Sequence, residues 1–171
     1  MAKSKNVSVD STLPISSDDR KIDPDVYNDV ARCAQLLSIQ LIESNFNISP
    51  SFFEEEYVDR QMKIDVDNVH ASFDEENRIA TCVFHFETYH KKARRKVFSL
   101  KDKFIVFYHI DNECDDFHAL AFANRVGFMA AYPYFRTHVA ETASLAAADI
   151  PVLPTVSSMP VKRRSSQEEV K

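Results

Sequence analysis

Tyr132–Pro154 reads Tyr-Pro-Tyr-Phe-Arg-Thr-His-Val-Ala-Glu-Thr-Ala-Ser-Leu-Ala-Ala-Ala-Asp-Ile-Pro-Val-Leu-Pro and predicts one helix with both ends marked. Pro133 suits a first helical turn, where its missing N–H costs nothing. The helix is expected to end near Asp149, because the residue before Pro151 is pushed out of the α region. Residues at helical spacing form one largely apolar stripe along it: Phe135, Val139, Thr142, Ala143 and Ala146. Everything upstream is expected to be sheet for this helix to cover.

Two upstream segments alternate apolar with polar residues, as half-buried strands do: Arg60–Val66 and Ile79–Tyr89. Val97–Ile110 is predicted to be a long last strand, with little alternation. Ahead of them, a short helix leading into a strand over Leu36–Asn47 is predicted. The connections are too short for crossover helices, so the sheet is antiparallel. The sequence therefore predicts an α+β fold, with a four-stranded antiparallel sheet covered on one face by a long C-terminal helix.

Several boundaries and interruptions are also expected. Lys101–Lys103 interrupts the last strand and indicates a bulge or an exposed midpoint. Asp115–Val126 predicts a first helix, which Gly127 breaks before the principal one. Residues 1–25 are polar and predict a disordered arm, 26–156 form the single domain, and 157–171 predict a disordered tail.

The composition excludes several classes of protein. The net charge of −5 argues against nucleic acid as the main partner. The chain has one glycine, where average usage would give about twelve, so it has no glycine-rich loop for phosphates. No apolar run approaches the ~20 residues that span a bilayer, and Met1–Asp23 lacks the apolar core of a secretory signal. We therefore expect a cytoplasmic protein without membrane insertion, in which Cys33, Cys82 and Cys114 are reduced.

Catalytic and metal-binding patterns are weak. His109, Cys114 and His118 carry atoms that zinc accepts, but their spacing matches no ligand pattern. No glycine-flanked nucleophile turn is present. The sequence therefore predicts no enzyme, no metal and no cofactor. The basic hairpin Lys91–Lys96 leaves two interpretations open, a phosphate-binding site or a solvated tip that protects strand edges.

An apolar surplus points to a binding surface. Phe104 and Phe107 are expected on opposite faces of the sheet, and one helical layer covers only one face. Phe52 and Phe53 are adjacent in an expected loop, where large apolar residues are unusual. This surplus indicates oligomer contacts first, and a surface for apolar ligands second.

Three motifs resemble the SecB export-chaperone family, which includes SecB-like chaperones of toxin–antitoxin systems. Tyr132–Arg136 resembles that family's Phe-Pro-Tyr-Ala-Arg-Glu helix start. Ile150–Pro154 follows at a similar distance and is similar to its Phe-Pro-x-Leu-x-Leu-x-Pro. Ile39–Phe46 resembles its first-strand pattern ending in Asp-x-Ser-Phe. The likeness covers about Leu36 to Pro154, and the motifs carry it in combination.

The resemblance implies a holdase that uses no ATP and holds unfolded or nascent chains in apolar grooves. It also implies dimers that pair through helices into a tetramer. The client-binding residues expected from it are Phe52, Phe53, Tyr57, Phe104 and Phe107. The residues expected on the oligomer helix are Tyr132, Phe135, Val139, Ala143 and Ala146.

Two departures affect the expected partner. Glu43 corresponds to an acidic contact of the SecA motor, but Asn47 stands where the family has a second acidic residue. The polar segment 157–171 stands where the family has a second helix. An antitoxin as a dedicated client therefore becomes more plausible than docking on SecA. Two alternatives stay open: an adaptor for one fixed protein partner, and a small hydrolase that would unite His109, Cys114 and His118 with a nucleophile.

Overall fold

The structure is a computed structural model that describes residues 22–56, 60–111 and 114–155. The predicted tail lies outside these residues, as does the predicted arm, apart from its last four residues. Those four already include Pro24, where the first helix begins. The elements are, in chain order, α1 (Pro24–Cys33), β1 (Ala34–Ile48), η2 (Pro50–Phe52), β2 (Lys63–Asp74), β3 (Ile79–Lys92), β4 (Arg95–Ile110) and α2 (Asp116–Leu145).

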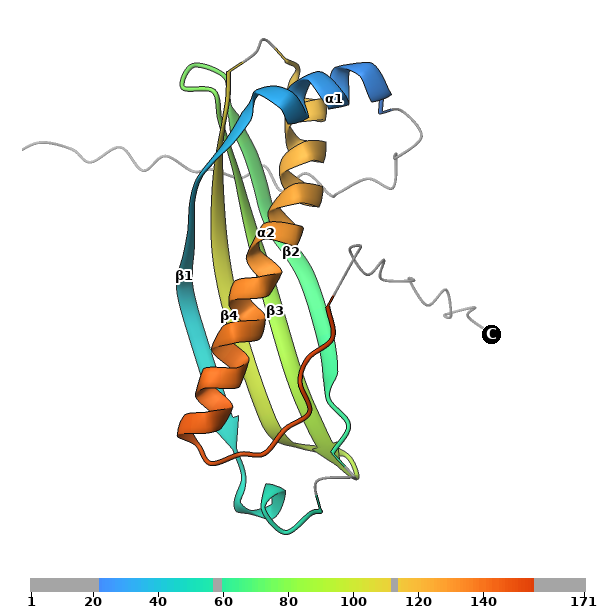
Figure 1. Ribbon diagram of the computed structural model, residues 1–171, viewed down its shortest axis with the longest axis vertical. Coiled ribbons are helices and arrows are strands. Elements are labelled where there is room, and N and C mark those ends of the chain that lie inside the picture. Colours follow the sequence, from blue (N-terminus) through green and yellow to red (C-terminus); the bar gives the residue numbers. More distant parts are fainter. Residues whose placement is uncertain (1–21, 57–59, 112–113, 156–171) are drawn as a thin grey trace, which may run out of the picture.

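The four strands form one antiparallel sheet in the order β1-β4-β3-β2. Since β1 and β2 are the two edges, the chain crosses from one edge to the other through η2. Figure 1 shows α2 running diagonally along one face, α1 at one end of the sheet and η2 at the other end. This arrangement confirms the predicted fold class. In the described segments, no helix has both the length and the apolar character needed to cross a bilayer.

Phenylalanines fill the space between the sheet and α2. The predicted alternation in β3 is confirmed, because Ala80, Cys82, Phe84 and Phe86 are all fully buried on the face that α2 covers. The ring of Phe86 stacks on that of Phe135, with 5.1 Å between the ring centroids. Burial raises the pKa of the Cys82 thiol to about 12, so this thiol stays protonated, and all three cysteines are free.

The predicted division into two helices is wrong. A single helix, α2, runs through both Gly127 and Pro133, so neither residue is at a helix end. Gly127 is buried where α2 comes closest to the sheet, and a Cβ built on it would lie 3.0 Å from the Phe84 ring. The glycine therefore permits close packing and does not break the helix.

Pro133 is tolerated because it lies on the outer side of α2. A proline inside a helix leaves the carbonyl four residues earlier without its partner. That carbonyl belongs to Met129, and since Met129 and Pro133 are both exposed, water can satisfy it. The prediction of a helix start at Pro133 followed the common case, in which proline occupies the first turn.

The end of α2 also differs from the prediction. The helix stops at Leu145, and Ala147 adopts a left-handed conformation with φ of 51°. The N–H of Ala148 donates to the carbonyl of Ala143, and the N–H of Ala147 donates to that of Ser144. This pair of bonds is a Schellman motif, which glycine usually makes possible. The sequence signal at Pro151 lies beyond it, in a segment that runs back along α2.

A buried histidine joins the two helices at the other end of the molecule. His118 Nε2 accepts the backbone N–H of Asp23, the N-cap of α1, at 3.1 Å. His118 Nδ1 lies 2.8 Å from the carboxylate of Asp115, the N-cap of α2. The hydrogen bond from the backbone N–H of His118 lowers the pKa of Asp115. Because Nε2 accepts a hydrogen bond, His118 is the neutral form with its proton on Nδ1.

We expect Gly127→Val to destabilise the fold by about 2 kcal/mol, since the added side chain overpacks the contact with Phe84. The matched control is Ala140→Val, at an exposed position of the same helix, which should cost no more than about 0.5 kcal/mol through helix propensity. Urea unfolding of both variants measures the difference. Equal losses would contradict the close approach at Gly127.

Candidate functional site

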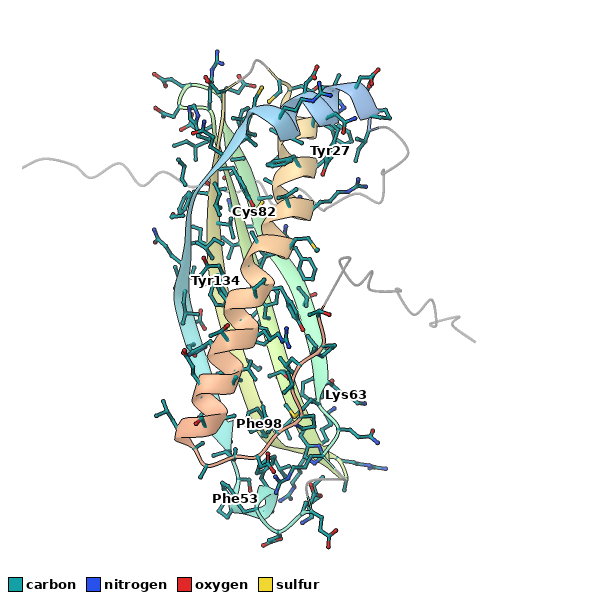
Figure 2. The ribbon with its side chains drawn as sticks, viewed as in Figure 1. Tyr27, Phe53, Lys63, Cys82, Phe98 and Tyr134 are labelled. Atoms are coloured by element: carbon teal, nitrogen blue, oxygen red, sulfur yellow. The ribbon has the colours of Figure 1, made fainter. Side chains whose placement is uncertain are left out.

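An open groove lies between β1 and the outer side of α2. Its volume is about 490 Å³. Apolar side chains supply most of its surface, and helix side chains add three polar groups. The residues that line this β1 groove are Ile39, Leu41, Phe104, Pro133, Tyr134, Thr137, His138 and Glu141. Tyr134 lies on the side of α2 that faces β1 (Figure 2).

The strand that borders the groove is an edge strand with two irregularities. Its pairing with β4 skips Leu37 and Ile42, so each is an extra residue in β1. The bulges place apolar neighbours side by side at the surface, and Leu36 and Leu41 are exposed together with Leu37 and Ile42. The missing alternation of apolar and polar residues in this segment therefore has a structural cause, because a bulged strand does not keep strict alternation.

His138, which lines the groove and is half-buried, contacts a buried carboxylate. Asp102 of β4 is fully buried, and one carboxylate oxygen lies 2.7 Å from Nδ1 of His138 on α2. The other oxygen has no hydrogen-bond partner in the described part of the chain. The predicted bulge at Lys101–Lys103 is wrong, since β4 pairs continuously with β3 there, and of the three residues only Lys101 is exposed. The carboxylate points inward because Asp102 is in phase with the buried residues Leu100 and Phe104 of β4, and His138 meets it from the helix.

We expect His138→Ala to destabilise the fold by about 3 kcal/mol, because it leaves a carboxylate buried without a partner. The control is the double variant Asp102→Leu with His138→Leu, which removes both polar groups and should recover most of that loss. Urea unfolding of the three proteins measures it. A stability of His138→Ala within experimental error of the wild type would show that the pair does not hold α2 to the sheet.

A second hollow lies on the other side of α2. The segment after the helix folds back along it, fixed by a 2.7 Å hydrogen bond from the Tyr132 hydroxyl to the carbonyl of Pro154. The space between this segment and α2 has a volume of about 540 Å³. We call it the C-terminal hollow, and it is lined chiefly by Val139, Ala140, Ala143, Ile150, Val152 and Leu153. Val152 is 79% exposed at its rim.

The connection between β1 and β2 packs at the same end of the molecule as the C-terminal hollow. We call residues 49–56 the η2 loop. Phe52 is fully buried against Phe98 of β4, whereas Phe53 is 51% exposed and lies at the tip (Figure 2). The Arg60 guanidinium lies 4.3 Å from the centre of the Phe52 ring. Arg60 also donates to the carbonyls of Glu55 and Asp149, so it joins the η2 loop to the segment that closes the C-terminal hollow.

The structure separates the residues expected to bind clients. Phe104 lines the β1 groove but is itself almost fully buried. Phe107 is half-buried on the opposite face of the sheet, where α2 does not reach. Phe52 belongs to the core, Phe53 is at the surface, and Tyr57 lies outside the described residues. A client-binding role for these residues stays a prediction, and Phe53 offers the most exposed aromatic surface among those described.

The residues expected on the oligomer helix face the chain's own sheet. Tyr132, Phe135, Val139 and Ala143 are buried in the core, and Ala146 is half-buried at the end of α2. They are therefore covered within one chain, and the oligomer stays a prediction. Tyr134 is exposed on the outer side of the helix, whereas His138 is half-buried on its flank, in contact with Asp102. The stripe analysis selected neither residue, and the cue for both is a helix position outside the buried stripe.

Two charged features contact groups of the same chain. Glu43 pairs with Lys103 on the neighbouring strand, and this hydrogen bond holds the pKa of its exposed carboxyl below the usual range. In the basic hairpin, the ammonium of Lys96 lies 4.1 Å from the centre of the Tyr89 ring. Lys92 pairs with Glu54 of the η2 loop at 3.3 Å. These contacts favour the interpretation of the hairpin as a solvated tip.

In residues 22–56, 60–111 and 114–155, no three His, Cys, Asp or Glu side chains gather closely enough to hold a metal ion. His109, Cys114 and His118, whose spacing matches no ligand pattern, do not form such a group, and the ring nitrogens of His118 are engaged in the helix contacts described above.

The fold is that of the SecB-like chaperones, which confirms the resemblance at the level of fold. Among solved structures, the chain is similar to the SecB-like chaperone Rv1957 of Mycobacterium tuberculosis, in complex with a ChAD peptide from the Rv1956 HigA1 antitoxin. The TM-score is 0.62 at 19% sequence identity, and the match covers 80% of this chain and 99% of that chain. No family model and no curated protein sequence matches the chain.

Proposed function

We propose that the chain is an ATP-independent holdase of the cytoplasm, without catalytic activity, that binds unfolded or nascent polypeptides. The observation that carries this proposal is the open, largely apolar C-terminal hollow beside α2. Apolar burial stabilises a bound segment by roughly 25 cal/mol per Å² whatever its sequence, so such surfaces suit many clients.

The C-terminal hollow is the better candidate for client binding. It combines an apolar lining with exposed side chains at its end of the molecule, namely Val152 and, on the nearby η2 loop, Phe53. An unfolded segment that covers these side chains removes apolar surface from water. The likeness in fold to a chaperone solved with an antitoxin peptide supports an antitoxin as one dedicated client. Because Glu43 already pairs with Lys103, it supports docking on SecA less strongly than this likeness supports an antitoxin client.

The β1 groove suits a second copy of the chain, because it lies beside an edge strand with free backbone groups. Four large apolar side chains are exposed on that strand within seven residues: Leu36, Leu37, Leu41 and Ile42. Contact between two such edges would cover them and the outer side of α2 together. A homo-oligomer built this way leaves the C-terminal hollow of each copy open.

The test of client binding is the aggregation of a denatured, unrelated protein diluted into this protein without nucleotide. The wild type should suppress aggregation at about one oligomer per client. The double variant Phe53→Ser with Val152→Ser should bind about tenfold more weakly, a loss of about 1.4 kcal/mol. Both residues are exposed, so the fold is kept.

The matched control is Leu145→Ser, which removes a side chain that is 90% exposed but lines neither hollow. It should suppress aggregation as well as the wild type does. An oligomer that is folded but suppresses no aggregation would contradict the holdase and favour an adaptor for one fixed partner.

The test of the oligomer contact is the mass in solution by light scattering. Ile42→Lys places a charge on the β1 edge and should convert the oligomer to smaller species, since charged edge residues oppose strand pairing. The control is Val69→Lys on the β2 edge, where the side chain is similarly exposed, at 48%, and the mass should not change. A monomeric wild type would contradict the proposed assembly.

A further inference from the structure

One buried histidine contacts the η2 loop, in addition to the packing of Phe52 on Phe98 and the ion pair of Lys92 with Glu54. His90 lies near the end of β3 and is 4% exposed. Its Nδ1 lies 3.1 Å from the backbone carbonyl of Gln61, just before β2. Its Nε2 lies 2.6 Å from a carboxylate oxygen of Glu55, at the end of the described part of the η2 loop. A single imidazole therefore contacts both the loop and the start of the edge strand.

These partners require a bound proton. A backbone carbonyl only accepts hydrogen bonds, so Nδ1 carries a hydrogen. A neutral imidazole would then present a lone pair on Nε2 to a carboxylate oxygen, and two lone pairs at 2.6 Å repel each other. The contact is attractive only if one further proton lies between Nε2 and Glu55. It is then either an imidazolium facing a carboxylate or an imidazole facing a carboxylic acid.

The other buried histidine with two ring contacts has the opposite pattern. His118 Nε2 accepts a backbone N–H, so that ring needs no second proton. The two histidines differ in their partners. The ring of His118 contacts one donor and one acceptor, whereas the ring of His90 contacts two acceptors. The proton requirement is thus specific to the end of the molecule that carries the η2 loop.

The charged groups around the pair come from three elements. The η2 loop supplies Glu54 and Glu55, and β3 supplies Lys92, which pairs with Glu54. Arg60, just before β2, contacts the backbone carbonyl of Glu55 and the Phe52 ring. From the segment after α2, Asp149 contributes only its backbone carbonyl, bound to Arg60. Facing His90 across the sheet, β4 supplies the uncharged Phe98.

We propose that the proton shared by His90 and Glu55 holds the η2 loop against the sheet, and that its loss releases the loop and exposes Phe52. This proposal rests on the proposed function for its consequence, which is a larger aromatic surface for clients. The direction follows from the proton count. The closed loop binds a proton that the released loop does not need, so closure is favoured at lower pH and lost as pH rises.

The experiment is a pH series of aromatic ¹H–¹³C spectra of the full chain between about pH 6 and pH 9. The His90 ring signals and the Phe52 signals should shift together with one midpoint. Glu55→Gln is the informative variant, because its amide N–H can donate to an unprotonated Nε2. This variant should keep Phe52 at its low-pH signal position over the whole range. Glu54→Gln, in the same loop, should behave as the wild type does.

Phe52 signals that do not change while His90 titrates, or identical pH profiles for the wild type and Glu55→Gln, would overturn the proposal. Capture of reduced, carboxymethylated lactalbumin, which stays unfolded over this range, measures the consequence separately. Binding by the wild type should tighten several-fold as pH rises, and binding by Glu55→Gln should not. Movement of Phe52 without tighter binding would overturn the regulatory role. Movement of Phe52 in a protein that binds no unfolded chain at all would overturn the proposed function and leave the proton-controlled loop intact.

Discussion

The structure depends on one long helix lying close against an aromatic sheet. Phe84 and Phe86 of β3 meet Phe128 and Phe135 of α2 in a continuous layer of rings. The helix can approach this layer because Gly127 has no Cβ where the Phe84 ring lies. In the described part of the chain the outer side of α2 is open on both flanks, and the two hollows lie along these flanks.

Much of the fold could be predicted from the sequence, because the relevant signals are periodic. The alternation in β3 predicts the buried face correctly, and the short connections correctly predict that the strands pair antiparallel. The errors fell on single residues whose meaning depends on tertiary contacts. Gly127 in isolation indicates a helix break, and only the adjacent ring of Phe84 shows that it permits packing. Asp102 likewise indicates a solvated position until His138 is brought to it from α2.

The candidate site was less accessible to sequence reasoning. The apolar surplus was a valid signal, and Phe104 does line a groove. The sequence does not show which of these apolar residues lie in the core, in the groove or on the far face of the sheet, because their placement depends on the bulges at Leu37 and Ile42. Adjacent Phe52 and Phe53 are equivalent in sequence, yet one is buried and the other exposed. Phe52 is the one that Arg60 and His90 contact. Both residues are too far from Phe52 in the sequence for a local pattern to reveal the contact.

The strand order has a consequence for the synthesis of the chain. The β2–β3 and β3–β4 pairs are hairpins and can form as soon as they are made. Strand β1 is made first among the strands, but its partner is β4, with Ile48 opposite Phe98 and Ala34 opposite Ile110. Such a non-local pair forms slowly, and a chain folds from its N-terminus as it emerges. During its own translation the protein therefore carries an uncovered apolar segment, of the kind that its proposed clients present.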